Sequence, residues 1–202
     1  FKFEYTVALP GVTISATKMN VFYKGLDNPV SVGVSGVPSE KVTASISQGS
    51  IKPDGDGGYV VRVNDINKEA VVTAYADVEG QKKQMGQMSF RVKKVPDPKP
   101  VVGGMSGGKI KANKWRVQQG VIAVLEDFLF DLRFNVISFE MTYAAKREDL
   151  RISKTTGTLF NEEMKSWMKK AKPGDAYYLD NVKAKGPDGS VRTLPSIAFQ
   201  II

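Results

Sequence analysis

The stretch from Gly103 to Lys109 has the glycine and lysine spacing of a phosphate-binding loop. That motif requires a serine or threonine after the lysine to hold magnesium, and this chain has Ile110 there. It also requires a strand before the loop and a helix after it, so that backbone amides and the helix dipole meet at the phosphate. Prolines precede this loop and a polar, lysine-rich stretch follows it. We therefore interpret it as a linker and expect no nucleotide site.

Two serine–lysine pairs have the Ser-x-x-Lys spacing of penicillin-recognising enzymes, Ser106 with Lys109 and Ser166 with Lys169. The segment 154–157 resembles the third motif of those enzymes with an extra residue, but the middle Ser-Asp-Asn motif is missing. The chain contains no histidine and no cysteine, which excludes Ser-His-Asp and Cys-His nucleophiles, zinc fingers and disulfides. We expect a protein that is not an enzyme and that carries no cofactor.

Two groups of carboxylates could bind a metal or act as acid and base. The stretch 54–59 begins like a calcium loop, but glycine replaces the third acidic ligand, tyrosine stands where glycine is required, and aspartate stands at position twelve. Asp127 and Asp131 could pair as glycosidase carboxylates, although no partner pattern accompanies them. We expect a turn at the first place and structural carboxylates at the second.

The run 109–116 gathers four cations around one tryptophan: Lys109, Lys111, Lys114, Trp115 and Arg116. Charge and stacking of this kind could bind nucleic acid. However, the 29 Lys and Arg residues are scattered along the chain and do not gather on any known nucleic-acid-binding element. Against 21 Asp and Glu residues, they give a net charge of +8. We expect no nucleic-acid partner and interpret the run as a face for an acidic protein.

The first half of the chain has the pattern of short strands. Apolar and polar residues alternate, and turn signals at 27–29, 36–38, 54–58 and 79–80 separate the alternating stretches. About seven strands over residues 1–95 are typical of an immunoglobulin-like sandwich. The clearest predicted strands are 30–35, 42–46, 59–63, 71–78 and 88–92, with another at the start of the chain.

A proline- and glycine-rich stretch at 96–108 separates the two halves. Pro96, Pro98 and Pro100 forbid helix and remove donors from a strand ladder, and four glycines follow within 103–108. This composition predicts a semi-rigid linker with a hinge. The domains are therefore expected at 1–95 and 109–202.

The second half is predicted to be β-rich with one packed helix at 161–171. Asn161 can cap that helix, acidic residues occupy its first turn, and lysines occupy its last. An apolar stripe lies on one face, and Pro173 with Gly174 ends the helix. Residues 186–189 predict a hairpin turn. Predicted strands are 121–125, 133–143, 176–183 and 197–202.

The chain begins within a strand pattern at Phe1, so we expect a fragment of a longer protein. No run of 18 apolar residues occurs, and we expect no membrane contact by this fragment.

Several separated segments resemble the GldM/PorM family of the gliding-motility and type IX secretion machinery of Bacteroidetes. The most specific is the Lys-Met-Asn-Val strand followed by Tyr-x-Gly-x-Asp-Asn-Pro within 17–32. The other segments, which follow in the same order as in the family, are 90–98, 102–108, 131–139, 173–178 and 180–195. The resemblance covers essentially the whole chain, which would be the third and fourth domains of the periplasmic part.

The resemblance implies a mechanical role rather than a chemical one. Family members dimerise and are anchored in the inner membrane by an N-terminal helix that pairs with GldL/PorL, a segment absent from this sequence. Their distal domains reach the outer-membrane-associated ring of GldK/PorK and GldN/PorN. We accordingly expect a homodimer that is periplasmic and carries force or conformational change to that ring. The alternative from the residues alone is a carbohydrate- or surface-binding tandem that uses exposed aromatic side chains such as Trp115.

Overall fold

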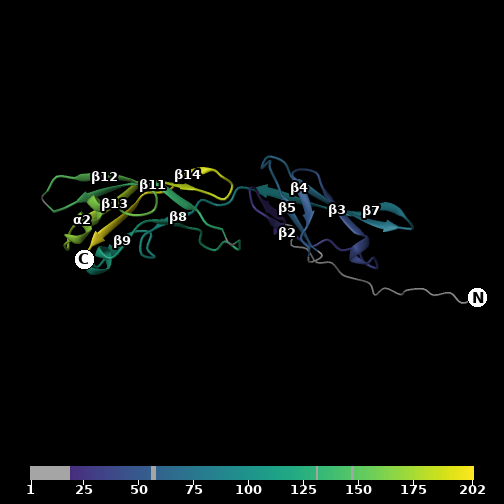
Figure 1. The fold of residues 1–202 in the computed structure, drawn as a ribbon, viewed down its shortest axis with the longest axis horizontal. Helices are drawn as coiled ribbons and strands as arrows, with labels where there is room; N and C mark the ends of the chain where they lie inside the picture. The colour runs from purple at the N-terminus through teal and green to yellow at the C-terminus, as the bar shows by residue number, and fades with distance from the viewer. Residues whose placement is uncertain (1–18, 56–57, 131, 147) are drawn as a thin grey trace, which may run out of the picture. The chain divides into compact units, whose positions relative to one another are not determined.

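The computed structural model describes residues 19–55, 58–130, 132–146 and 148–202. The chain divides into two compact units, Phe1–Val95 and Pro96–Ile202, and each is built mainly from strands (Figure 1). The fold is therefore mainly β, with two β-rich domains in tandem, as the strand patterns predict. The predicted strand at the start of the chain lies outside the described residues.

The first unit is a sandwich of two sheets. One sheet has the strand order β1-β7-β6-β3, formed by β1 (Val21–Tyr23), β7 (Gln81–Lys93), β6 (Ala70–Val78) and β3 (Val42–Ile46). The other has the order β2-β5-β4, formed by β2 (Asn28–Val30), β5 (Tyr59–Arg62) and β4 (Ser50–Pro53). A short 3₁₀ turn, η2 (Ser39–Lys41), precedes β3. Side chains from both sheets share one core: Phe22, Val61, Val63, Ala70, Val72 and Val92.

A buried asparagine holds the turn between β1 and β2. Asn28 is only 2 % exposed, and its Nδ2 donates to the carbonyl oxygens of Tyr23 (3.0 Å), Leu26 (3.0 Å) and Val61 (3.2 Å). Its Oδ1 accepts the backbone amide of Tyr23 at 2.8 Å. The Asp-Asn-Pro sequence therefore joins the two sheets, because this one side chain bonds to β1, to its own turn and to β5.

Two strand predictions in this unit are wrong in extent. The predicted strand 30–35 ends at Val30 in the structure, and β7 begins at Gln81 rather than near residue 88. The extra length of β7 comes from the tight turn at Glu79 and Gly80, both with positive φ, which lets a polar continuation of the strand pair with β6. Polar composition conceals such a strand from an analysis based on apolar alternation.

The second unit has a main sheet with the order β12-β11-β13-β15-β9, and β14 also pairs with β13. A separate two-stranded sheet pairs β10 with β8. The hairpin β13–β14 turns at 186–189, as predicted. The strand bounds are β8 (Lys99–Val101), β9 (Gly108–Ile110), β10 (Ile122–Val124), β11 (Asn135–Ala144), β12 (Arg151–Thr156), β13 (Ala176–Lys185), β14 (Val191–Thr193) and β15 (Ile197–Ile201).

The predicted helix is confirmed as α2 (Glu162–Lys169). The Oδ1 of Asn161 accepts the backbone amide of Met164 at 2.9 Å, which is the expected N-cap. Met164, Trp167 and Met168 face the core, and Trp167 stacks on Tyr143 of β11 with ring centroids 6.1 Å apart. The capping, charge and apolar signals thus predict the position of this helix, which ends at Lys169 rather than at residue 171.

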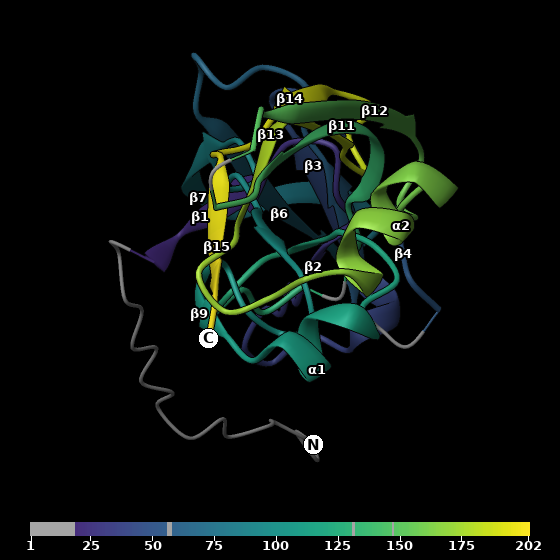
Figure 2. The same ribbon diagram turned by 90° about the vertical axis from the view of Figure 1, so that its left-hand side faces the viewer.

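A second helix contradicts the expectation of one helix. The short α1 (Ala112–Arg116) lies on the same side of the main sheet as α2 (Figure 2). Its Trp115 packs against Tyr177 and Phe199, each with ring centroids 4.9 Å away. Five residues without a capping side chain are too short to reveal a helix from sequence, so packing of the tryptophan is what stabilises it.

The predicted linker 96–108 is also corrected, because it forms part of the second unit. Pro98, Pro100 and Val102 are buried, and two strands lie within or overlap the segment. Proline is tolerated in β8 because that strand pairs on one side only, in a two-stranded sheet. Gly107, with φ +119°, allows close approach: a Cβ there would lie 2.9 Å from the carbonyl oxygen of Ala198. The stretch is packed structure, not a hinge.

Candidate partner-binding site

Four of the five candidate residues of the basic run are exposed, and the fifth is buried. Lys109 is exposed in β9 beside β15, while Lys111 and Lys114 are exposed at and within α1. Trp115 is fully buried, which corrects the expectation that it contacts a partner. The tryptophan is instead a core residue, and the carbohydrate alternative loses the aromatic on which it rested.

Arg116 opens onto a surface pocket of about 610 Å³. The pocket lies among the end of α1, the connection between β11 and β12, the end of α2 and the loop before β13, with both helices visible in Figure 2. We call it the basic pocket. Six cations line it: Arg116, Lys146, Arg151, Lys169, Lys170 and Lys172.

Charge in the basic pocket is strongly unbalanced. Its six cations face two carboxylates, Glu148 and Asp175, which leaves a local charge of 6 − 2 = +4, half of the +8 carried by the whole chain. Glu148 is paired with Arg151 at 2.9 Å. Among the described residues, no carboxylate lies within 4.0 Å of Lys146, Lys169 or the other two lysines of the pocket. The pocket is therefore suited to an anion.

Asp175 is buried at the floor of the pocket, where its carboxylate accepts hydrogen bonds from within the second unit. It is 5 % exposed, and its Oδ2 accepts the hydroxyl of Tyr143 at 3.0 Å and the backbone amide of Lys172 at 2.9 Å. Burial raises the pKa of Tyr143 to about 12, and the bond to Asp175 adds to the effect. Burial also raises the pKa of Tyr177, whose hydroxyl donates to the carbonyl of Trp167 at 3.0 Å. Both phenols are therefore neutral at neutral pH, and Tyr143 is the one that lines the pocket.

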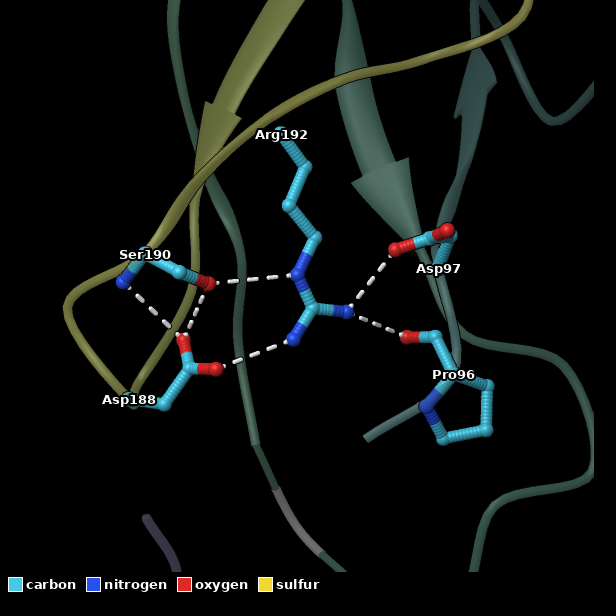
Figure 3. A network of polar contacts seen from close by, with 5 residues as sticks. All are labelled: Pro96, Asp97, Asp188, Ser190 and Arg192. Atoms are coloured by element: carbon cyan, nitrogen blue, oxygen red, sulfur yellow. Dashed lines mark hydrogen bonds and ion pairs between the residues drawn. The ribbon is translucent and has the colours of Figure 1, made fainter. Parts of the chain in front are cut away.

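A second polar cluster fixes the start of this unit (Figure 3). The Nη1 of Arg192, in β14, donates to the carbonyl of Pro96 and to Asp97, both at 3.0 Å. Its Nη2 donates to Asp188 at 3.0 Å and its Nε to Ser190 at 3.2 Å. Burial alone would raise the pKa of Asp188, but the bonds from Ser190 and Arg192 outweigh it and lower that pKa. We call this arrangement the Arg192 clamp.

The remaining chemical motifs have structural roles in the structure. Ser166 donates its hydroxyl to the carbonyl of Glu163 at 2.7 Å, within α2. Asp54 accepts the amide of Gly58 at 2.9 Å, which is the bond of a turn. Asp127 has a positive φ of 53° in a loop, and its proposed partner Asp131 lies outside the described residues. No cluster of three or more metal-ligating side chains occurs among the residues that the structure describes.

Sequence reasoning missed most of the basic pocket. The lysines of the α2 end are visible in the sequence as charges that complement a helix dipole. Lys146 and Arg151 flank the connection between β11 and β12, and no local pattern links them to α2. Only the return of the chain through β11, β12 and α2 brings these charges together.

The fold and the pocket define a class: a tandem β protein whose second domain carries a cationic surface pocket. Matches to family models supply the family. Residues 11–93 match the GldM third domain, and residues 96–202 match the GldM C-terminal domain. The chain therefore belongs to the GldM family, as the resemblance of its segments predicts. No curated protein matches the chain.

Among solved structures, the chain is similar to a crystal structure of Dscam1 isoform 1.9, N-terminal four Ig domains. The two share 11 % identity with a TM-score of 0.28, and the match covers 91 % of this chain and 49 % of that one. This chain thus spans about half the length of that structure. The likeness is too slight to bear on fold or function. In the described part of this chain, no helix is both long and apolar enough to cross a membrane.

Proposed function

We propose that this chain transmits force, as a periplasmic homodimer, from an inner-membrane motor to an outer-membrane-associated ring. GldM-family domains are structural components of the gliding-motility and type IX secretion machinery, and they are periplasmic. The motor subunit would be GldL/PorL, reached through a part of the protein outside this sequence. The ring subunits would be GldK/PorK and GldN/PorN. The observation that carries the proposal is the unbroken succession of the third and C-terminal GldM domains.

The junction between the units supports a mechanical role. Strand β7 ends at Lys93, and Pro96 and Asp97 are the first residues of the second unit. A pull on the chain at this point acts directly on Pro96 and Asp97. The Arg192 clamp holds both of these residues to the hairpin β13–β14. Several charge-assisted bonds to one guanidinium resist displacement better than a single bond does.

The proposal also includes ring contact through the basic run, but only through its four cations, because Trp115 is buried. Lys109, Lys111 and Lys114 are exposed and available to an acidic surface. Arg116 would contribute from the edge of the basic pocket. These cations would steer association rather than supply most of the affinity.

The test uses the whole 202-residue chain immobilised through its C-terminus, with purified ring subunits in solution. We expect retention of the GldK/PorK and GldN/PorN subunits and a light-scattering mass of two chains, 2 × 22.1, or about 44 kDa. Charge reversal of Lys111 and Lys114 should weaken retention, while charge reversal of Lys93 and Lys94 in the first unit should not. A one-chain mass at every concentration, with no retention of either ring subunit, would overturn the proposal.

A further inference from the structure

We propose that the basic pocket is the docking site for an acidic segment of a partner protein, with several Asp or Glu side chains on an extended stretch. The inference deepens the proposed function and rests on it only in taking the partner to be a protein. It concerns the pocket of the second unit and not the exposed lysines at 109–114.

The lysines of the basic pocket come from separate parts of the chain. Lys169 and Lys170 end α2, where cations offset the negative end of the helix dipole. That role does not account for Lys146, which follows β11 and is far from α2 along the chain. The pocket thus collects four lysine side chains from two stretches of the chain, Lys146 and 169–172, and like charges gathered in this way repel one another. Among the described residues, no ion pair to any of these four lysines offsets that repulsion. An external anion would relieve it.

The cations that remain available in the pocket suit the carboxylates of a peptide better than a phosphate group. Arginine is favoured where phosphate is bound in a fixed orientation, because two parallel N–H groups of the guanidinium match two phosphate oxygens, whereas lysine binds phosphate only as a point charge. Each arginine of the pocket already uses part of its guanidinium within the protein: Arg116 donates to the carbonyl of Ala171 at 2.7 Å, and Arg151 pairs with Glu148. The groups left are lysines, which are point charges on flexible stems. Such charges adapt to carboxylates at variable positions along a peptide.

The size of the pocket and the packing of its floor also favour a peptide segment over a single small anion. At about 610 Å³, the pocket falls within the range of about 300–1,000 Å³ typical of sites for ligands with many atoms, and a single anion would fill little of it. Its floor is stiff, because Tyr143 stacks on Trp167 and is bonded to Asp175. A rigid floor beneath mobile lysines favours a segment that lies across the pocket and offers several carboxylates at once.

The experiment measures binding of a fluorescent ten-residue glutamate peptide to the whole 202-residue chain by anisotropy. A ten-residue glutamine peptide is the neutral control. We expect the glutamate peptide to bind and the glutamine peptide not to bind. Raising the ionic strength from about 0.1 M to about 1 M, which shortens the Debye length from about 10 Å to about 3 Å, should abolish binding.

Two double variants locate the site. Lys169→Gln with Lys170→Gln, and separately Lys146→Gln with Lys172→Gln, should each weaken binding about tenfold. Glutamine keeps the helix propensity of α2, and the second pair lies outside any helix, so folding is preserved in at least one of them. The matched control is Lys93→Gln with Lys94→Gln, which removes the same charge from the first unit and should leave binding unchanged.

The results of these measurements distinguish peptide binding in the pocket from diffuse charge attraction and from binding of lipid or phosphate. Equal weakening by the control and pocket variants would overturn the inference, since it would mean diffuse attraction to a basic protein. Pocket-dependent binding of phosphatidylglycerol vesicles or inorganic phosphate in preference to the peptide would also overturn it. Pocket-dependent peptide binding, found together with a one-chain mass and no retention of either ring subunit, would uphold the inference and defeat the proposed function instead.

Discussion

The hydroxyl of Tyr143, in strand β11, donates a 3.0 Å hydrogen bond to the buried carboxylate of Asp175, 32 residues further along the chain. The same carboxylate oxygen accepts the backbone amide of Lys172. One carboxylate thus joins the central sheet to the loop that carries a lysine of the basic pocket. The rigidity of the pocket floor depends on this bond.

Tyr143→Phe should destabilise the protein by about 1–3 kcal/mol, because a buried carboxylate loses a hydrogen-bond donor that water cannot replace. Urea unfolding followed by far-ultraviolet circular dichroism measures the change. Tyr178→Phe is the control, since Tyr178 lies on the same sheet but is 42 % exposed, and it should change stability by less than about 0.5 kcal/mol. Equal effects of the two substitutions would contradict the assigned role of Tyr143.

Stability should fall at alkaline pH. The folded protein holds the proton of Tyr143 up to a pKa of about 12, above the ordinary tyrosine value of 10.0. A raised folded pKa means stability that is fully present below pH 10 and lost as the pH rises toward 12. Tyr177 contributes in the same direction. Unfolding midpoints measured at several pH values from 8 to about 11.5 should therefore decline, and the decline should be shallower in Tyr143→Phe.

Asn28→Ala should destabilise the first unit by about 2–4 kcal/mol. The substitution removes four bonds at once and leaves the carbonyls of Leu26 and Val61 without this donor in the buried turn. Thermal unfolding resolves the effect, because the first unit should then melt earlier than the second. Asn64→Ala, at an exposed site, is the control and should shift the melting temperature little. A melting curve of the Asn28 variant that matches the control would refute the role of this asparagine.

Arg192→Lys should loosen the start of the second unit. A lysine cannot replace the guanidinium, which is shared among Pro96, Asp97, Asp188 and Ser190. We expect faster hydrogen exchange at the amides of Lys99 and Val101, in β8, and a loss of about 1–3 kcal/mol in stability. Arg62→Lys is the matched control, because Arg62 pairs with Asp27 at the surface, where an ion pair contributes about 0–1 kcal/mol. Unchanged exchange at Lys99 and Val101 would rule out the clamp.

Local sequence signals were sufficient for some elements. The helix α2 follows from its cap, its charge order and its apolar stripe, all contained within about twelve residues. The β-sandwich of the first unit follows from alternation and turn residues, which act over single strands and hairpins. Such features need no knowledge of distant segments, so the sequence alone determined them, together with the resemblance that its separated motifs carry.

Features that depend on contacts between distant parts of the chain were decided only by the tertiary structure. Trp115 looks exposed beside its lysines, yet distant Tyr177 and Phe199 enclose it, because burying a large ring outweighs the local polarity of its neighbours. Prolines and glycines at 96–108 look like a linker, yet β10 and β15 provide pairing partners that the segment cannot reveal by itself. The basic pocket likewise unites charges from separate segments of the second unit, and Coulomb interactions depend on distance in space rather than separation along the chain.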